Sequence, residues 1–589
     1  MLVYGDAVRR ETAGEKLARI QDYLGRAGSA EPWVVRHGWS VAALIEAGEL
    51  AQGIADRAFE AHGSRDVRGA EAGCAMELTL ALARAVGSSW RGFDVQLAPV
   101  YGAIARLGEV APDGDLAIKL PEGFGHYALY PETYFEAALP LAGRDADVIG
   151  IRSIGTTLAA MVAAAIEAPC PATVRPVGHP FGRELALVEG EGLGLRPHAE
   201  LAIVDEGPGL SGSSIVAVAE AAGREGVGPD RIHVFPSHRN GPGPKAGETA
   251  QRFWRSARVS VRSFDDLALG RDRHRRLESW FADLIGEPTA PTREISGGVW
   301  RGLRFGSPAD WPPVHAWQER RKFLVETASG TWLLKFAGLG RIGLDKFEKA
   351  QALAMAGFAT APLGFRHGFT VEPWHQAATA LDPFGPTRER FLAHLGAYLR
   401  FRVHRFPAEP DRGASAEQLL VMLRANVEEE FGPDSIAPLE RWRTRLASLS
   451  ATAVRVATDN RLHAWEWLVL PSGEILKTDA VDHHVGHDLV GCQDLAWDIA
   501  GASVEFRLSQ EEQEALIEQT EHRGVGVCPD RVRFLTLCYP AFQLGYYREA
   551  AASASDDREA VRLRGRAELY AATLRRSLAS SDQAKGMAS

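Results

Sequence analysis

Cysteine is scarce in this sequence, and long hydrophobic runs are missing. The 589 residues include five cysteines, Cys74, Cys170, Cys492, Cys528 and Cys538, and no two of them form a CxxC pair. This spacing argues against structural zinc and favours a reducing compartment. No run approaches the roughly 18 apolar residues of a membrane span, and the opening MLVYGDAVRRETAGEK has no apolar signal core. We therefore expect a soluble, cytoplasmic protein without a membrane partner.

An excess of positive charge is also missing. The formal net charge is -10 and the isoelectric point is near 6.0, whereas a nucleic-acid binder needs a wide basic face to neutralise phosphates. No nucleic-acid partner is expected, although local basic sites for small anions are compatible with this charge. Hydrophobic residues make up 46% and charged residues 24%, which is typical of a globular chain. The length exceeds what one hydrophobic core supports, so two to four domains are expected.

The pattern of apolar residues divides the chain into four parts. Residues 1–110 repeat apolar positions at three- and four-residue steps, which predicts a helical N-terminal region. Residues 111–265 alternate short apolar runs, such as ADVIGI and ELAIVDE, with helical segments, which is typical of a parallel sheet. Residues 266–295 end in a Pro/Thr-rich stretch and are predicted to be a linker. Residues 296–589 begin with strand-like segments and continue as mainly helix.

The stretch LAIVDEGPGLSGSS, residues 201–214, carries the clearest chemical signal. A strand runs into Asp205 and Glu206 and then into a loop of small residues before a helix. Glycines let backbone amides approach an anion, and the following helix N-terminus favours a phosphate. Two carboxylates suit vicinal hydroxyls, because each ionised oxygen accepts a charge-assisted hydrogen bond. A phosphate next to a diol describes a ribose 5-phosphate.

This stretch resembles the phosphoribosyl pyrophosphate (PRPP) motif of the type I phosphoribosyltransferases. The resemblance implies that Asp205 and Glu206 hold the ribose hydroxyls. It assigns the 5-phosphate to the loop residues Gly209, Leu210, Ser211, Gly212 and Ser213. At Gly209 the purine-type members usually have an aspartate that assists the base, so this difference weakens the case for a purine acceptor.

Two further segments fit the same family. The sequence DADVIGIRSIGTTLAAMVAA resembles its pyrophosphate loop, which assigns the leaving pyrophosphate to Arg152, Ser153, Ile154 and Gly155. His179 and Arg183 lie on a Pro/Gly-rich loop between the two motifs and are lid candidates, because the reacting centre must be kept from water. Mg²⁺ is the expected cofactor, since it would neutralise the leaving group. Other nucleotide-type α/β sites remain an alternative interpretation.

The C-terminal part resembles aminoglycoside-phosphotransferase-like kinases. GTWLLKFAG places Lys335 on a strand, and the next helix carries Glu348; an ion pair between such residues would aim the ammonium group at ATP phosphates. The resemblance assigns metal binding to Asp479 and Glu466. It departs from the family at Arg461, which stands where a catalytic aspartate is expected, and arginine cannot accept a hydroxyl proton. Asp459 is a possible substitute, and a non-catalytic pseudokinase is the alternative.

The histidine-rich DHHVGHD, with His483, His484, His487 and Asp488, is interpreted as a loop that makes hydrogen bonds rather than as a metal site. The predicted fold is α/β. It combines a parallel-sheet phosphoribosyltransferase-like domain, which has a helical N-terminal region, with a two-lobe α+β kinase-like domain at 296–589.

Three functions are compatible with this fold. The first is phosphoribosyl transfer from PRPP to a small-molecule acceptor, or its reverse, with a kinase-like domain that binds ATP or phosphorylates a related metabolite. The second is a non-catalytic PRPP or nucleotide sensor. The third is a small-molecule or protein kinase regulated by the phosphoribosyl domain. The acceptor and the oligomeric state, including a homodimer, are left open.

Overall fold

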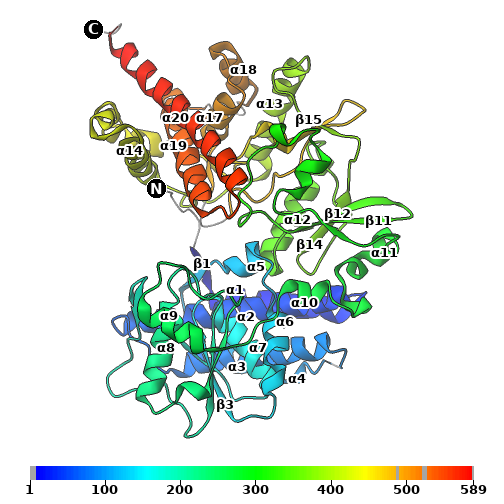
Figure 1. Cartoon of the computed structure of the whole chain (residues 1–589), viewed down its shortest axis with the longest axis vertical. Coiled ribbons are helices and arrows are strands. Elements are labelled where there is room, and N and C mark those ends of the chain that lie inside the picture. The colour runs from blue at the N-terminus through cyan, green and yellow to red at the C-terminus, as the bar shows by residue number, and fades with distance from the viewer. Residues whose placement is uncertain (1–7, 94, 486–489, 521–526, 587–589) are drawn as a thin grey trace.

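The computed structural model describes residues 8–93, 95–485, 490–520 and 527–586, and Figure 1 shows two lobes stacked along the long axis of the molecule. One lobe holds the N-terminal helices and a parallel sheet. The other holds an antiparallel sheet and the C-terminal helices. The chain is therefore a mixed α/β protein, as predicted, with its two kinds of sheet in different lobes.

The parallel sheet has the strand order β4-β3-β7-β8-β9. Its strands are β3 (Ala146–Ile151), β4 (Ala172–Val174), β7 (Glu200–Val204), β8 (Ile232–Phe235) and β9 (Arg258–Val259). Helices α7 (Gly155–Ile166), α8 (Ser213–Arg224) and α9 (Glu248–Ser256) lie between them along the chain. The chain moves from β3 to β4 on one side and then to β7 on the other. Ligands bind at such a reversal, beyond the carboxyl ends of the strands.

The N-terminal helices cover α7 rather than forming a separate unit. They are α1 (Ala13–Ser29), α2 (Trp33–Ala61), α3 (Ala70–Trp90) and α4 (Ala98–Val110), and β1 (Val8–Thr12) pairs with β2 (Asp115–Lys119) beyond the predicted boundary at residue 110. Helix α2 is buried on most of its surface, because it packs against α1, α3 and α7. Short helices α5 (Glu122–His126) and α6 (Pro131–Ala138) follow β2.

The apolar run ELALVEG, residues 184–190, is a further strand-like segment in the sequence, but it does not join the parallel sheet. The chain instead forms a small hairpin of β5 (Val177–His179) and β6 (Gly182–Glu184) next to α8. The apolar side chains of Leu185 and Leu187 pack against the core beneath the sheet, and Leu187 forms only an isolated parallel bridge with Asp66. The alternating apolar positions of this run are therefore explained by the packing of Leu185 and Leu187 from a loop, not by a strand of the sheet.

The second lobe contains an antiparallel sheet in the order β10-β11-β12-β14-β13. The strands are β10 (Arg293–Glu294), β11 (Lys322–Thr327), β12 (Gly330–Phe336), β13 (Gly364–Arg366) and β14 (Phe369–Pro373), and helix α12 (Gly340–Met355) lies between β12 and β13 along the chain. Short strands β15 (Thr379–Ala380), β17 (Trp467–Val469) and β18 (Ile475–Lys477) form a smaller sheet, and β16 (Arg455–Val456) pairs with β19 (Gln493–Asp494).

The remaining C-terminal elements are mainly helical. The longest are α13 (Arg388–Arg405), α14 (Ala416–Phe431), α17 (Ala496–Glu505), α18 (Gln510–Thr520), α19 (Pro529–Ser553) and α20 (Asp557–Gly586), with short α15 (Glu440–Arg443) and α16 (Leu446–Ala451) between α14 and β16. An antiparallel sheet with one helix, followed by a helical lobe, agrees with the two-lobe layout predicted for this part.

Residues 266–295 are not a bare linker. Helix α10 (Phe264–Ala268), a short turn around Trp280 and helix α11 (Ala282–Ile285) contribute buried side chains to the core that joins the two lobes. Apolar residues spaced along this segment explain its packing, and they outweigh the Pro/Thr composition on which the linker prediction depended.

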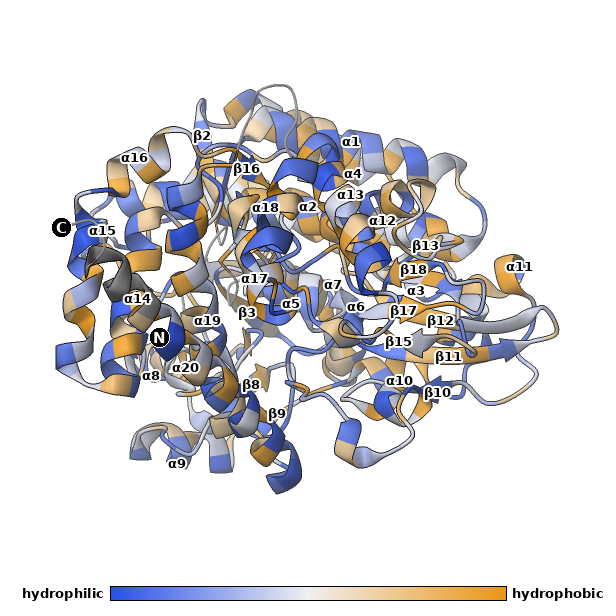
Figure 2. Ribbon diagram, turned by 90° about the horizontal axis from the view of Figure 1, so that it is seen from above, coloured by the Kyte–Doolittle hydropathy of each residue, from blue (hydrophilic) through white to orange (hydrophobic). Residues whose placement is uncertain are grey.

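Hydrophobic residues gather in the interior of both lobes, and polar residues alternate with them along the outer helices (Figure 2). Among the described residues, none of the helices combines the length and the apolar character that crossing a bilayer requires.

The contact between α2 and α7 should tolerate no added side-chain volume. A Cβ atom at Gly48 would lie 2.9 Å from Cβ and 3.2 Å from Cα of Thr157. We expect Gly48→Ala to lower the free energy of unfolding by about 1–3 kcal/mol, because the helices must move apart. Gly25→Ala, at an open position of α1, should instead stabilise the protein by about 0.5–1 kcal/mol. Calorimetric melting of both variants checks this; equal melting temperatures would contradict it.

Candidate functional sites

The two loops predicted to bind PRPP lie side by side in the structure. They follow β3 and β7, which are parallel neighbours, and a Cβ atom at Gly155 would lie 2.9 Å from the carbonyl oxygen of Val204. Gly209 and Gly212 have φ angles of 60° and 64°, a region that favours glycine. The sequence therefore brings both small-residue loops to the reversal point of the sheet.

Asp205 and Glu206 are both half-buried at this edge. The Glu206 amide donates a hydrogen bond of 2.8 Å to Oδ1 of Asp205, and the hydroxyl of Tyr134 donates to the Asp205 carbonyl oxygen. Burial raises the pKa of Asp205 to about 7, because the ionised form loses hydration. A Cβ atom at Gly123 of α5 would lie 2.6 Å from Oε1 of Glu206, so this carboxylate rests against the short helix.

The loop after the acids contacts the β5–β6 hairpin. Ser213 donates from its Oγ to the Pro180 carbonyl oxygen at 2.7 Å, and the Oγ atoms of Ser211 and Ser213 are 3.0 Å apart. Leu210 is 75% exposed at the loop tip. The hairpin also carries the lid candidates His179 and Arg183, whose side chains interact with the hairpin's own backbone. Their proposed contact with a ligand stays a prediction.

Arg152 does not face a ligand, which corrects the sequence prediction for its side chain. The side chain is 3% exposed, and its guanidinium donates to Asp56 of α2 at 2.9 Å, to Asp66, and to the Thr173 carbonyl oxygen at 3.1 Å. Two carboxylates from the N-terminal helical region thus neutralise its charge. Nothing in the local sequence indicates these partners, because they lie about a hundred residues away. Pyrophosphate binding by the amides of Ser153, Ile154 and Gly155 stays a prediction.

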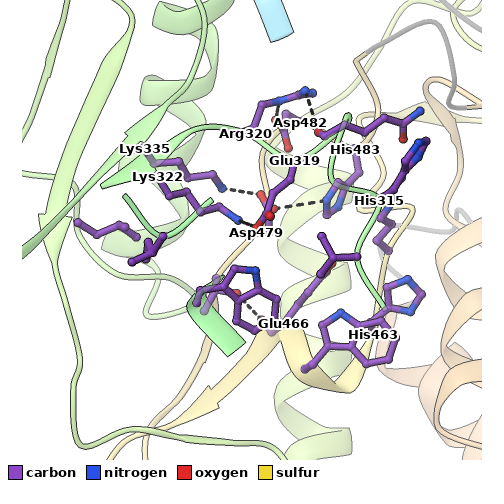
Figure 3. Close-up of a pocket in the computed structure, with 18 of the residues that line it drawn as sticks. His315, Glu319, Arg320, Lys322, Lys335, His463, Glu466, Asp479, Asp482 and His483 are labelled. Carbon is purple, nitrogen blue, oxygen red and sulfur yellow. Dashed lines mark hydrogen bonds and ion pairs between the residues drawn. The ribbon is translucent and has the colours of Figure 1, made fainter. Parts of the chain in front are cut away.

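A second candidate site is a cavity of about 200 Å³ between the antiparallel sheet and the C-terminal helical lobe (Figure 3). Lys335 of β12 lies 2.6 Å from Oδ1 of Asp479, which follows β18. Burial favours the neutral form of each group, but their attraction outweighs it, so the pKa of Lys335 is raised and that of Asp479 is lowered. Apolar side chains, including Leu333, Pro373 and Leu468, line another part of the cavity.

Glu348 does not pair with Lys335, which corrects the ion pair predicted from the sequence. Its side chain is exposed on α12, whereas Lys346 of the same helix is buried and lies 3.4 Å from Asp482. Arg320 lies 3.1 Å from the same carboxylate. Burial lowers the pKa of Lys346 to about 8. The prediction selected the wrong acid, because the approximate helical position of a partner does not fix which side chain faces the sheet.

The segment 459–461 is held by Asp498 of α17. Oδ2 and Oδ1 of Asp498 accept hydrogen bonds from the amides of Asp459 at 2.8 Å and Asn460 at 2.9 Å. Asp459 is fully buried and contacts Tyr398, Lys477 at 3.5 Å and His483 at 3.4 Å. These partners make it a poor base.

The neighbouring Arg461 lines the cavity with its guanidinium 4.5 Å from the centre of the Tyr546 ring. Neither position considered for the catalytic base therefore provides one: Asp459 is buried, and residue 461 is an arginine.

Two groups of side chains could hold a cation here. Oxygen and nitrogen atoms of Asp479, Asp482 and His483 converge in one group, and those of Asp459, Glu466 and His483 in the other. Glu466 already forms an ion pair with Lys477, whose Nζ lies 2.7 Å from Oε2 of Glu466. The sequence predicted Asp479 and Glu466 as metal ligands. It missed Asp482 and His483, because the histidines of this loop do not have the spacing of a known metal-binding motif. His487 and Asp488 lie outside the described residues.

Replacing Arg152 should affect stability more than ligand binding. We expect Arg152→Met to destabilise the protein by about 3–5 kcal/mol, since it leaves Asp66 and part of Asp56 buried without their partner. Arg183→Ala, on the exposed hairpin, should change the free energy of unfolding little. Denaturant unfolding of both variants measures the difference. Unchanged stability of Arg152→Met, together with weaker pyrophosphate binding, would return the guanidinium to a ligand-binding role.

Comparisons with known proteins give fold similarities only. No protein-family model and no curated protein matches the chain. The chain is similar to choline kinase LicA from Streptococcus pneumoniae, with 15% identity, a TM-score of 0.32, and 50% of this chain and 96% of that one covered. A choline/ethanolamine kinase family protein from Mesorhizobium loti has 17% identity and a TM-score of 0.31, with 50% and 92% covered.

An aminoglycoside phosphotransferase from Streptomyces rimosus, solved with ADP and streptomycin, has 18% identity and a TM-score of 0.25, with 40% of this chain and 94% of that one covered. None of these three is described as a phosphoribosyltransferase, so that resemblance stays a prediction from the sequence.

Proposed function

We propose that the C-terminal cavity binds a nucleoside triphosphate with a divalent cation and that the protein is a kinase-like phosphotransferase. The observation that carries this proposal is the Lys335–Asp479 pair, 2.6 Å long, on opposite walls of the cavity. A buried ammonium and a buried carboxylate at one site suit a phosphate and its cation respectively. Lys322 and Arg320 line the same cavity and add positive charge.

The residues present fit Mg²⁺ through their oxygen atoms. Asp479 and Asp482 are close enough to share one ion, and Glu466 lines the cavity near them. Mg²⁺ would neutralise the charge that develops on the transferred phosphoryl group. The protein's own contribution is to hold Lys335 on a strand, fix Asp479 at a hairpin end and exclude water with the apolar wall.

His463 is the group that we assign to accept the substrate proton. It lines the cavity two residues after Arg461, and its Nδ1 lies 3.2 Å from Oε2 of Glu505. This contact has the distance of an ion pair but not the geometry of a hydrogen bond, and histidine is the side chain that most often serves as a general base. Nε2 of His463 lies 3.4 Å from the Tyr547 hydroxyl, on the side of the ring away from Glu505. This arrangement replaces the aspartate that Arg461 displaces.

Removing either charge of the Lys335–Asp479 pair should abolish tight nucleotide binding. We expect Lys335→Met and Asp479→Asn to weaken MgATP binding at least tenfold, because each removes a charge-assisted contact worth about 1.5–3 kcal/mol. Glu348→Gln, on the exposed face of α12, is the matched control and should bind normally. Isothermal titration with ATP, with and without Mg²⁺, measures the affinities.

Turnover separates binding from chemistry in the same proteins. His463→Gln should keep the MgATP affinity of the unaltered chain and lose at least tenfold in kcat for ADP release. An Asp479→Asn variant that binds MgATP as tightly as the unaltered chain would overturn the nucleotide site.

A ribose 5-phosphate ligand at the edge of the parallel sheet is a second candidate function. It is supported by the adjacency of the loops 152–155 and 205–213, and by the two acids beside glycines with positive φ. With PRPP as donor, the reaction would displace pyrophosphate with a small-molecule acceptor, and Mg²⁺ would bind the pyrophosphate. Binding of PRPP at these loops without turnover would make the protein a PRPP sensor.

PRPP binding should strengthen with pH if Asp205 holds the ribose. Its pKa of about 7 means that the carboxylate is mostly protonated at pH 6 and mostly ionised at pH 8, so the affinity should rise about tenfold across this range. Asp205→Asn should bind weakly at both pH values. Titration of PRPP into both proteins at the two pH values measures this, with Asp147→Asn, at the opposite end of the sheet, as the control. An unchanged slope in Asp205→Asn would remove the residue from the site.

A further inference from the structure

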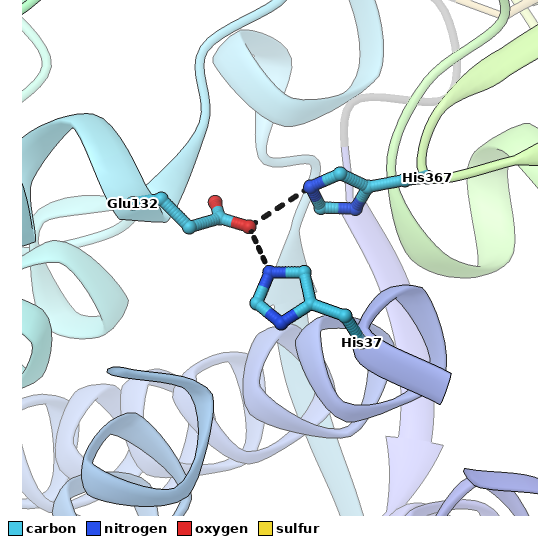
Figure 4. Close-up of side chains that lie close together, drawn as sticks. All are labelled: His37, Glu132 and His367. Carbon is cyan, nitrogen blue, oxygen red and sulfur yellow. Dashed lines mark hydrogen bonds and ion pairs between the residues drawn. The ribbon is translucent and has the colours of Figure 1, made fainter. Parts of the chain in front are cut away.

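Three buried side chains meet where the two lobes join, away from both sites described above. His37 comes from α2, Glu132 from α6 and His367 from the turn between β13 and β14 (Figure 4). All three side chains have 0% exposure. Nε2 of His37 lies 2.7 Å, and Nε2 of His367 2.9 Å, from the same atom, Oε1 of Glu132. Three segments far apart in the sequence therefore direct metal-ligating atoms at one point.

Hydrogen bonding within the chain does not satisfy these atoms. Only the His37–Glu132 contact has hydrogen-bond geometry; Nε2 of His367 faces Oε1 without it. Among the described residues, Oε2 of Glu132 and Nδ1 of His367 also have no hydrogen-bond partner. A buried carboxylate oxygen without a partner is costly. The cluster therefore lacks a group that interacts with the carboxylate and with the second imidazole.

The surroundings fit an ion better than a polar ligand. Nδ1 of His37 lies 3.0 Å from Oγ of Ser89, which fixes the ring and leaves Nε2 to face Glu132, as in the outer contacts of metal-bound histidines. The rings of Tyr130 and Trp280 lie 4.9 Å and 5.1 Å from the His367 ring. Aromatic walls leave little room for a larger molecule.

We propose that His37, Glu132 and His367 bind one divalent transition-metal ion, of which zinc is the best match, and that this ion ties the two lobes together. Two imidazoles and a carboxylate are typical ligands of zinc, and a bidentate Glu132 would supply four donor atoms. Metal–ligand distances of about 2.0–2.2 Å require the Nε2–Oε1 separations to widen to about 3.3 Å, which small rotations of the side chains provide. The complete burial of the ligands makes the ion structural.

The metal content of the purified full-length chain tests this proposal. After equilibration with zinc and dialysis, we expect about one tightly held equivalent per chain by mass spectrometry of the metal. His37→Gln and His367→Gln should each lose that equivalent. His233→Gln is the matched control, because His233 is a buried histidine that faces one carboxylate, Glu200, at 3.0 Å, and it should keep the zinc. Removal of the zinc by a chelator should lower the melting temperature of the unaltered chain and of His233→Gln, and leave those of His37→Gln and His367→Gln unchanged.

The other clusters must be separated from this one. His483 belongs to both cation groups of the C-terminal cavity, so His483→Gln should keep the tightly held zinc. If the triad variants fail to fold, X-ray absorption of the zinc-loaded unaltered chain decides, because this site has two imidazoles and each of the other groups only one. A chain that holds no zinc, retention of zinc by His37→Gln and His367→Gln, or a spectrum with a single imidazole would each overturn the proposal.

Discussion

The position of every candidate site depends on one continuous hydrophobic core that crosses the predicted domain boundaries. Leu44 of α2, Leu158 of α7, Trp280, and Phe336 and Phe369 of the antiparallel sheet belong to the same cluster of buried residues. A second cluster begins at Ala352 and fills the C-terminal helical lobe. The boundary between these cores therefore lies inside residues 296–589, at the cavity that holds Lys335 and Asp479. Opening of that cavity would separate the two cores. The carboxyl edge of the parallel sheet, by contrast, shares a core with the antiparallel sheet.

The segment around α5 connects the two candidate sites within this framework. Gly123 lies beneath the Glu206 carboxylate, while two residues later the Gly125 carbonyl oxygen accepts from Lys346 at 3.3 Å. The His126 carbonyl oxygen accepts from Arg320, and both of these cations face Asp482 in the cavity. Glu206 and the two cations that face Asp482 therefore contact the same short helix. This shared contact is the physical route by which binding at one site could affect binding at the other.

The sequence predicted what depends on local pattern and missed what depends on distant contacts. ADVIGI and ELAIV are buried on both faces, and their apolar runs located β3 and β7 together with the loops that follow them. The partners of Arg152, Asp56 and Asp66, come from the helical region, and no short-range signal links them. His37, Glu132 and His367 likewise have no motif spacing. A search for CxxC pairs could not find a site built from single residues on three segments.

The two sites differ in how their acids are neutralised, and this difference determines how each would bind a ligand. In the cavity, two carboxylates already pair with three cations: Asp479 with Lys335, and Asp482 with Lys346 and Arg320. A bound phosphate must take these cations from the carboxylates. Its binding therefore requires a metal ion that neutralises the carboxylates in their place. At the sheet edge, burial raises the pKa of Asp205 to about 7, because it outweighs the hydrogen bonds that the carboxylate accepts from the amides of Glu206 and Gly207. Hydroxyl donors or a cation on a bound ligand would lower the pKa of Asp205, so ligand binding at the sheet edge releases a proton from that carboxyl group. Binding in the cavity instead replaces one ion pair with another.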